Sequence, residues 1–525
     1  MFQKIKNSIK NNLAYWIFSF SLMLITLCIA TVNYSSSGDF SVNTPFGSTY
    51  GIIVYLLIIV FGGCGIYFFR KANNENVKLE KMFLWLAIPI GIVMCIATPL
   101  GRIPDEDDHA KKAMAISNGN LFSVADEEGN ATDMFNSKLN ELVSRTTSTY
   151  EEAWEKITLA ETEEEIEMKY NTQALYAPIC HTPQALGMLV ARIFGGGITS
   201  QMYMARIFNF SFAIFLIYNA IKLMPYKKYL ILCIATLPIS FNILPTMSAD
   251  ALTLAMALFY IAYILHLKFN EDIKEFSRKQ KIILFISTLI ISLCKIVYVP
   301  LCFLLLVLPK EKFTSMKKKN IFIIVTISLA AILNLTWLIY CSRFLIEFNA
   351  GVNSKEQVLY ILTNPFEYFI ILLRTINFHF NTYIAGLCGD ALGLFCVKAS
   401  EIYIYLCTII LFVLFFSNNE EEKIKFDLFT KIVFSVVFIG IVLLIYTSLY
   451  VQWTALKYPI INGVQARYFL PILLLTAIVF DNKKIIIKEK LNKYVLTFLL
   501  FFNLNVATAT IYTYYFGMLI DRYVK

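Results

Sequence analysis

The feature that most constrains this chain is a series of long apolar runs separated by charged segments. A helix that crosses a bilayer needs about 17 to 25 apolar residues. Eleven runs approach or reach this length, at residues 13–32, 51–69, 82–100, 202–223, 229–244, 251–267, 321–341, 402–416, 432–450, 468–480 and 495–515. Charged residues make up only 16% of the 525 residues, a smaller share than in a typical soluble domain. The sequence therefore predicts an all-α polytopic membrane protein with about 11 full spans.

Charge in the connecting segments predicts the orientation, because cytoplasmic loops are rich in Lys and Arg. Segment 101–181 has seven basic and 17 acidic residues, a net charge of −10, although the whole chain carries +9. We therefore expect this segment to be extracytoplasmic. Basic segments predicted to be cytoplasmic are 1–12, 70–81, 222–228, 268–281, 310–319, 420–431 and 483–493. The first run has no clear small-residue cleavage site after it and is interpreted as an anchored span.

Two segments do not fit a simple span. Segment 282–309 joins two predicted cytoplasmic loops, and its 28 residues would form a helix of about 42 Å, too long for one span and short for two. Two short helices meeting near Lys295 and Pro300 are expected, since Pro300 interrupts helical hydrogen bonding. Segment 366–384 is apolar but carries polar residues, so an interfacial or re-entrant helix is predicted there.

These features divide the chain into three parts. Residues 1–81 form an N-terminal extension of two spans, 82–480 a transmembrane core, and 481–525 a cytoplasmic loop with a final span. Within the acidic loop of the core, a helix should begin near Asp105 and end at Asn118-Gly119. A capping box at Thr149 predicts a second helix to about Tyr170, and a short apolar helix is expected at 183–194.

The most unusual polar stretch is Pro104-Asp105-Glu106-Asp107-Asp108-His109, directly after the run 82–100. Acidic side chains near lipid are costly, so such a cluster indicates a functional site. The alternative is a solvated helix start, where acids stabilise the first turn.

Other polar residues lie on the same predicted side of the membrane, and together they suggest a shared extracytoplasmic cavity. Each has a structural alternative: Ser248 and Asp250 could cap a helix, Lys295 could extend to the interface, and Arg467 could anchor a span. His109 and His181 lack the fixed spacing of a metal site, so no metal ligands are assigned, although a divalent cation stays an open alternative. The candidate cavity residues are Asp105, Glu106, Asp108, His109, Tyr176, His181, Ser248, Asp250, Lys295, Gln465 and Arg467.

This set of residues suits one kind of chemistry. A carboxylate can take the proton of an acceptor hydroxyl, while Lys and Arg stabilise a departing phosphate at the lipid surface. Both are needed to transfer a sugar from a polyprenyl-phosphate carrier outside the cell.

Several short motifs occur in a fixed order. They are Pro-Asp-Glu-Asp-Asp-His-Ala at 104–110 with Ser-Asn-Gly-Asn-Leu at 117–121, Ala-Leu-Tyr-Ala-Pro at 174–178, Thr-Pro-Gln-Ala-Leu-Gly at 182–187, Ala-Arg-Ile-Phe-Asn at 205–209, Leu-Pro at 237–238, Ser-Ala-Asp-Ala-Leu at 248–252, Lys295, and Gly-Val-Gln-Ala-Arg-Tyr-Phe-Leu-Pro at 463–471. From about residue 100 to 480 the chain resembles the bacterial membrane family called domain of unknown function 2142, whose usual acidic motif is Pro-Asp-Glu-Pro-x-His.

That family is similar to the C-type glycosyltransferases (GT-C fold), multi-span enzymes with an acidic motif in the first outer loop. The resemblance implies that Asp105 or Glu106 is the base and that Arg467 binds phosphate. Asp107-Asp108 replaces the usual spacing, and this leaves the choice between the two acids open.

The resulting hypothesis is an inverting transferase in the bacterial plasma membrane, with a GT-C-like core. It would move a sugar from a polyprenyl-phosphate donor, held by Lys295 and Arg467, to an extracytoplasmic glycan or wall polymer. The expected partners are the lipid-linked sugar, the acceptor and the bilayer, with no nucleic acid. The alternatives are a surface-polysaccharide polymerase and a lipid-linked glycan transporter or flippase, although transporters usually show helix breaks in both halves.

Overall fold

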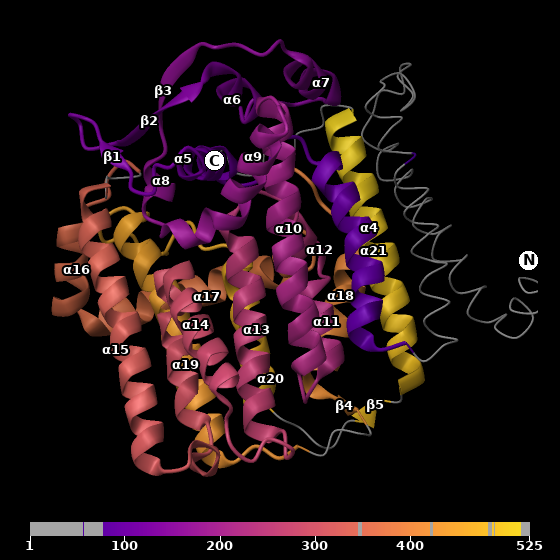
Figure 1. Ribbon diagram of the computed structural model, residues 1–525, viewed down its shortest axis with the longest axis vertical. Coiled ribbons are helices and arrows are strands. Elements are labelled where there is room, and N and C mark those ends of the chain that lie inside the picture. Colours follow the sequence, from indigo (N-terminus) through magenta and orange to yellow (C-terminus); the bar gives the residue numbers. More distant parts are fainter. Residues whose placement is uncertain are drawn as a thin grey trace, which may run out of the picture.

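The computed structural model describes residues 77–344, 349–419, 424–480, 486–487 and 489–515, together with Leu56. The predicted spans at 13–32 and, apart from Leu56, 51–69 lie outside these residues. The described part is a bundle of long helices with a smaller cap of short helices and strands across one end (Figure 1). The prediction of a helical polytopic membrane protein is confirmed at this level.

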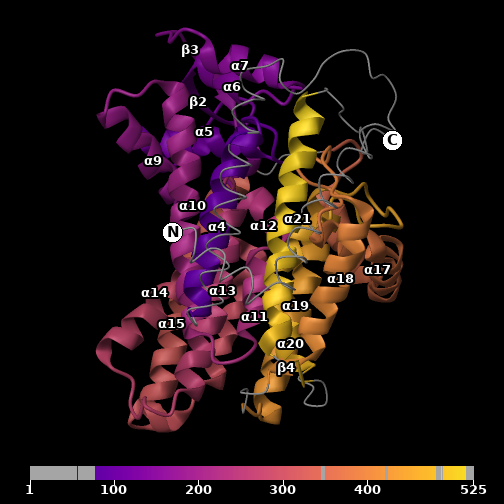
Figure 2. The ribbon, with the colours of Figure 1, turned by 90° about the vertical axis from the view of Figure 1, so that its right-hand side faces the viewer.

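The long helices of the bundle run side by side in both views (Figures 1 and 2). They are α4 (Leu79–Ala97), α10 (Ile198–Leu223), α13 (Ala249–Phe269), α14 (Arg278–Cys294), α15 (Met316–Cys341), α19 (Leu428–Gln452) and α21 (Glu489–Tyr515). Helix α10 packs against both α4 and α13. Gly91 permits the close approach of α4 to α10, because a Cβ atom there would lie 2.0 Å from the ring of Phe210.

The remaining elements of the bundle are mostly shorter. They are α11 (Lys228–Ala235), α12 (Pro238–Ile243), η2 (Ile296–Val307), η3 (Lys310–Phe313), η4 (Ser342–Phe344), α16 (Ser354–Thr363), α17 (Pro365–Leu387), α18 (Glu401–Phe416), η5 (Ala466–Ile472), α20 (Leu473–Val479) and the parallel pair β4 (Asn418–Asn419) and β5 (Ile486–Ile487).

The cap is built from the acidic segment and the residues that follow it. Its elements are α5 (Glu106–Ser117), β1 (Val124–Ala125), β2 (Ala131–Asn136), α6 (Ser137–Leu142), α7 (Tyr150–Thr158), β3 (Glu165–Lys169), α8 (Asn171–Ala174), η1 (Pro178–His181) and α9 (Thr182–Ile193). Strand β2 is the centre of an antiparallel sheet, with β1 and β3 on either side.

Most predicted boundaries in the cap are confirmed. Helix α5 ends before Asn118 and Gly119, and Gly119 adopts a positive φ of 97°. The capping box at Thr149 is present and begins α7. The prediction that this helix reaches Tyr170 is wrong, because residues 165–169 pair with β2 and bury Met168 in the core of the cap. The glutamate-rich sequence favours a helix locally, and pairing overrides that preference.

The predicted number of spans is wrong for the described residues. Five helices are long and apolar enough to cross a bilayer, and a bent helix pair would make six. The five correspond to the predicted runs 82–100, 202–223, 251–267, 321–341 and 432–450. Run 229–244 divides at Pro238 into α11 and α12, and run 468–480 begins as the 3-10 helix η5 around Pro471. Runs 402–416 and 495–515 lie in α18 and α21, whose apolar parts are shorter.

The predicted break in segment 282–309 is present at Lys295 but not at Pro300, which lies inside a helix. Segment 282–309 forms α14 and then η2, with Lys295 in extended conformation between them. Residues 366–384 lie in α17, which meets α16 at a bend of 107°, the geometry of a broken span or a re-entrant segment. Nonhelical backbone of this kind is tolerated at membrane depth where protein or a wet cavity covers it.

Candidate functional site

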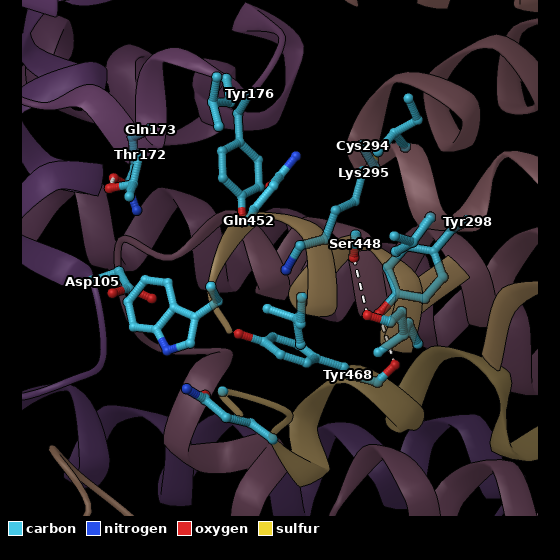
Figure 3. Close-up of a pocket in the computed structure, with 18 of the residues that line it drawn as sticks. Asp105, Thr172, Gln173, Tyr176, Cys294, Lys295, Tyr298, Ser448, Gln452 and Tyr468 are labelled. Carbon is cyan, nitrogen blue, oxygen red and sulfur yellow. Dashed lines mark hydrogen bonds between the residues drawn. The ribbon is translucent and has the colours of Figure 1, made fainter. Parts of the chain in front are cut away.

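A cavity of about 410 Å³ lies where the cap meets the bundle. The cap contributes Asp105, Arg145 and Tyr176, and the hairpin after α14 contributes Lys295 and Tyr298. Figure 3 shows Asp105 and Lys295 on opposite sides of this cavity, with Tyr176 and Tyr468 between them. The remaining wall comes from α15, α19 and the segment before η5.

Asp105 is the acidic residue of the cluster that reaches the cavity. Its backbone is left-handed, with φ 64° and ψ 9°, a conformation that costs a non-glycine residue about 1 to 2 kcal/mol. The carboxylate is 42% exposed and lies 3.0 Å from a guanidinium nitrogen of Arg467. Burial would raise the pKa of Asp105, but the charge and hydrogen bond of Arg467, together with the weaker effects of His109 and Arg145, lower the pKa below its usual range. Asp105 is therefore an ionised carboxylate facing the cavity at neutral pH.

Asp250 forms ion pairs with both candidate cations, Lys295 and Arg467. Its oxygens lie 3.1 Å from Lys295 Nζ and 3.4 Å from Arg467 Nε. Ser248 caps α13 as expected, by accepting a hydrogen bond from the backbone N–H of Asp250. Lys295 also lies 4.5 Å from the centre of the Tyr468 ring, a cation–π contact. Positively and negatively charged side chains thus alternate along a row of ion pairs. This ion-pair chain is defined as Lys295, Asp250, Arg467 and Asp105.

Arg467 and Gln465 retain unused hydrogen-bonding atoms. Within the described residues, Nη1 of Arg467 and Oε1 of Gln465 are buried without a hydrogen-bond partner. Gln465 lines the cavity, whereas Arg467 lies behind Asp105. Such atoms are costly to leave unpaired, and a polar ligand would satisfy them.

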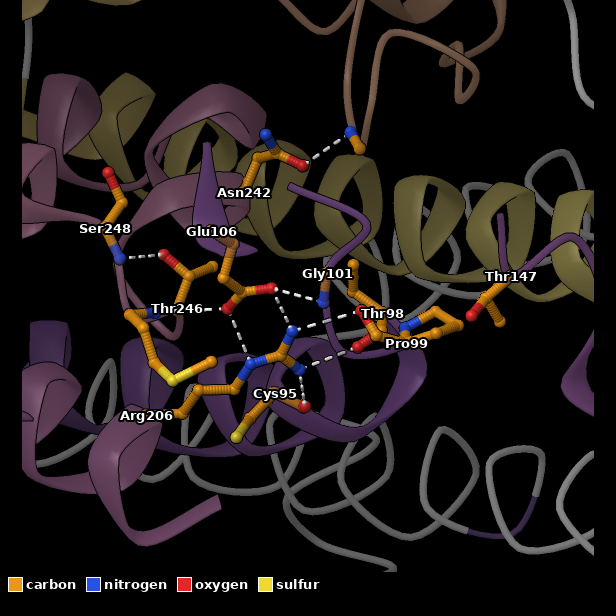
Figure 4. Close-up of polar contacts among 12 residues, drawn as sticks. Cys95, Thr98, Pro99, Gly101, Glu106, Thr147, Arg206, Asn242, Thr246 and Ser248 are labelled. Carbon is orange, nitrogen blue, oxygen red and sulfur yellow. Dashed lines mark hydrogen bonds and ion pairs between the residues drawn. The ribbon is translucent and has the colours of Figure 1, made fainter. Parts of the chain in front are cut away.

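Glu106 has a different environment from its neighbour. It is fully buried and pairs with Arg206 through two hydrogen bonds, of 2.9 and 2.6 Å. Each carboxylate oxygen also accepts a backbone N–H, from Met247 and Gly101 (Figure 4). Arg206 donates further to the carbonyls at the end of α4, namely those of Cys95, Thr98 and Pro99. Glu106 therefore ties four segments together and is not among the residues lining the cavity.

The other predicted site residues form a layer beside the cavity. His109 Nδ1 and His181 Nε2 are 2.7 Å apart, and both rings contact Tyr176 edge-on. Burial lowers the pKa of His109 to about 4, so the pair is neutral at physiological pH. Asp108 bonds to Lys111 and Thr172 and does not line the cavity, which is a correction to its predicted place. Of this layer, Tyr176 alone reaches the cavity wall.

The described residues contain no group of three or more His, Cys, Asp or Glu side chains able to hold a metal ion. The nine cysteines in this part of the chain are buried and form no disulfides.

Two arginines were missed by sequence reasoning. Arg206 lies within an apolar run, and a charge inside a span signals a buried acidic partner. Arg145 pairs with Asp107 at 2.7 Å and lines the cavity from a loop, where no sequence pattern marks it.

Comparison with known proteins gives one result. The model of the family described as "Predicted membrane protein (DUF2142)" matches residues 88–476, a segment that contains Asp105, Asp250, Lys295 and Arg467. No curated protein matches the chain, and no solved structure does. The family match covers well over half of the chain and agrees with the resemblance seen in the motifs. The chain therefore belongs to the DUF2142 family of predicted membrane proteins.

Proposed function

We propose that this protein is an inverting glycosyltransferase of the bacterial plasma membrane, with a GT-C-like core. It transfers a sugar from a polyprenyl-phosphate donor to a hydroxyl group of an extracytoplasmic glycan or wall polymer. The observation that carries the proposal is one cavity that holds both an ionised carboxylate, Asp105, and an ammonium group, Lys295. Transfer from a lipid phosphate needs both groups, one for the acceptor and one for the leaving phosphate.

Asp105 is the general base in this mechanism. The acceptor hydroxyl donates its proton to the Asp105 carboxylate while its oxygen attacks the anomeric carbon from the face opposite the phosphate. The bond from that carbon to the phosphate oxygen breaks, and its electron pair leaves with the polyprenyl phosphate. Lys295 stabilises the charge that develops on the phosphate. The products are the inverted glycoside and polyprenyl phosphate.

Arg467 positions the base. Its guanidinium is held between Asp105 and Asp250, which keeps the base ionised and oriented. Arg467 does not line the cavity, so the phosphate-binding role that the resemblance gives it falls to Lys295 in this mechanism.

The remaining wall suits the two parts of the donor. Gln173, Gln452 and Gln465 offer amide groups for sugar hydroxyls. Leu338, Ile445 and Leu449 are apolar residues of the same wall, and the first part of a lipid chain would lie against them.

Lys295→Met tests the phosphate contact. We expect donor affinity to fall by about 10- to 100-fold, because a hydrogen bond to a charged group contributes about 1.5 to 3 kcal/mol. The variant should still insert, since Asp250 keeps Arg467 as a partner. Titration of purified protein with a polyprenyl-phosphate sugar measures this, with the exposed Lys310→Met as the matched control. Unchanged affinity in Lys295→Met would remove Lys295 from the donor site.

The proposed orientation places the cap outside the cell. A cysteine at Glu127, an exposed residue of the cap, should react on intact cells with a membrane-impermeant thiol reagent. A cysteine at Lys279, exposed in the segment 268–281, should react only after lysis. The unmodified protein gives the background from its own cysteines. The reverse labelling pattern would overturn the extracytoplasmic site.

A further inference from the structure

The element that follows Lys295 has an uncommon conformation. Helix η2 is a 3-10 helix of 12 residues, whereas such helices seldom exceed three or four residues. Its hydrogen bonds have poorer geometry than those of an α-helix, so a long 3-10 helix is a costly way to cross apolar surroundings. A 3-10 helix has three residues per turn, so side chains three residues apart lie in a straight row along it. The corresponding rows on an α-helix wind around the axis.

One row of side chains on η2 is exposed or half-buried, and the residues on either side of it are buried. Phe303 is 45% exposed and Leu306 37%, with half-buried Pro300 and Pro309 continuing the same spacing of three. The residues between them, 301–302, 304–305 and 307–308, are all buried. The exposed row is defined here as Pro300, Phe303, Leu306 and Pro309. Every side chain in it is apolar.

The exposed row is continuous with the cavity. Val297, three residues before Pro300 and therefore in line with the row, is buried and lines the cavity, and its neighbour Ile296, which is 43% exposed, lines it as well. Helices α15 and α19 both pack against η2, and both contribute to the cavity wall. At about 2 Å per residue, η2 extends about 24 Å from the cavity, most of the thickness of the bilayer core.

We propose that the exposed row holds the hydrocarbon chain of a single-chain lipid phosphate, the polyprenyl phosphate, whose headgroup lies at Lys295. This inference rests on the proposed function and names where its donor lipid lies. A row one residue wide fits one chain, whereas a diacyl lipid would have to place two. Lys295 at the cavity end supplies the charge that selects a phosphate head.

The test separates the chain from the headgroup. Full-length protein in detergent is titrated with long-chain polyprenyl phosphate and with geranyl phosphate, which has the same head on a short chain. In the double variant Phe303→Ala/Leu306→Ala, affinity for the long-chain lipid should fall by about 10-fold, equivalent to about 1.4 kcal/mol. Affinity for geranyl phosphate should stay within about twofold, because the short chain ends near the cavity. The control Ile324→Ala/Val325→Ala changes exposed apolar residues of α15 and should leave both affinities unaltered.

Three results would overturn the assignment: no loss for the long-chain lipid, an equal loss for both ligands, or an equal loss for phosphatidic acid, which would identify a general lipid-facing surface. Failure of the proposed function gives a different pattern. If long-chain binding depends on Phe303 and Leu306 but no sugar is transferred from any prenyl-phosphate donor, the lipid site stands and the transferase does not. If a short-chain donor is used and the long-chain lipid ignores the exposed row, the transferase stands and the lipid site does not.

Discussion

Asp105→Asn is expected to lower the rate of sugar transfer by about 10²- to 10⁴-fold, the usual contribution of a general base. The amide has the same shape as the carboxylate but cannot accept the proton of the acceptor hydroxyl. Asparagine also suits this position, because it tolerates the left-handed backbone that Asp105 adopts. Donor binding should persist, since Lys295 and Asp250 keep their contact.

The matched control is Asp108→Asn, which changes an acid of the same cluster that points to Lys111 and Thr172. Transfer and donor binding are measured on both purified variants. Wild-type transfer by Asp105→Asn would exclude the proposed mechanism. Absence of donor binding by the unmodified protein would exclude a polyprenyl-phosphate transferase altogether and favour a transporter.

Glu106→Gln is expected to destabilise the fold by about 3 to 5 kcal/mol, the usual result of removing one partner from a buried ion pair. Both side chains of the Glu106–Arg206 pair are fully buried, so the substitution leaves the guanidinium uncompensated. The loss should also loosen Asp105, because Glu106 anchors the first turn of α5 to the end of α4. Thermal unfolding in detergent measures the effect, with Asp105→Asn as the comparison.

A second variant separates structure from catalysis at Glu106. In Glu106→Gln/Arg206→Met both charges are removed, and part of the lost stability should return, because no buried charge is left unpaired. Transfer should recover with stability if Glu106 only positions Asp105. If Glu106→Gln keeps its thermal stability yet loses transfer as Asp105→Asn does, Glu106 is the base, the other possibility that the resemblance allows.

Local patterns were enough to predict part of this protein. Long apolar runs predicted the five described helices that are long enough to cross a bilayer, because helix formation satisfies the backbone wherever lipid or protein replaces water. The break at Lys295 followed from the charges flanking segment 282–309, whereas Pro300 lies within η2 and does not interrupt it. The capping box at Thr149 and the end of α5 at Gly119 depend on contacts within a few residues, and both are present.

The remaining features depend on partners far away in the chain. Residues 165–169 became a strand through pairing with β2, and run 229–244 became two short buried helices within the bundle. The sequence also placed Asp105 and Glu106 side by side without distinguishing them. Glu106 meets Arg206, 100 residues away, and is sealed in the protein, whereas Asp105 meets Arg467, 362 residues away, and faces the cavity. The sequence alone determined that charged residues cluster next to an apolar run, whereas tertiary packing decided which of these charges are paired inside the fold and which remain accessible to a ligand, because their partners lie far away in the chain.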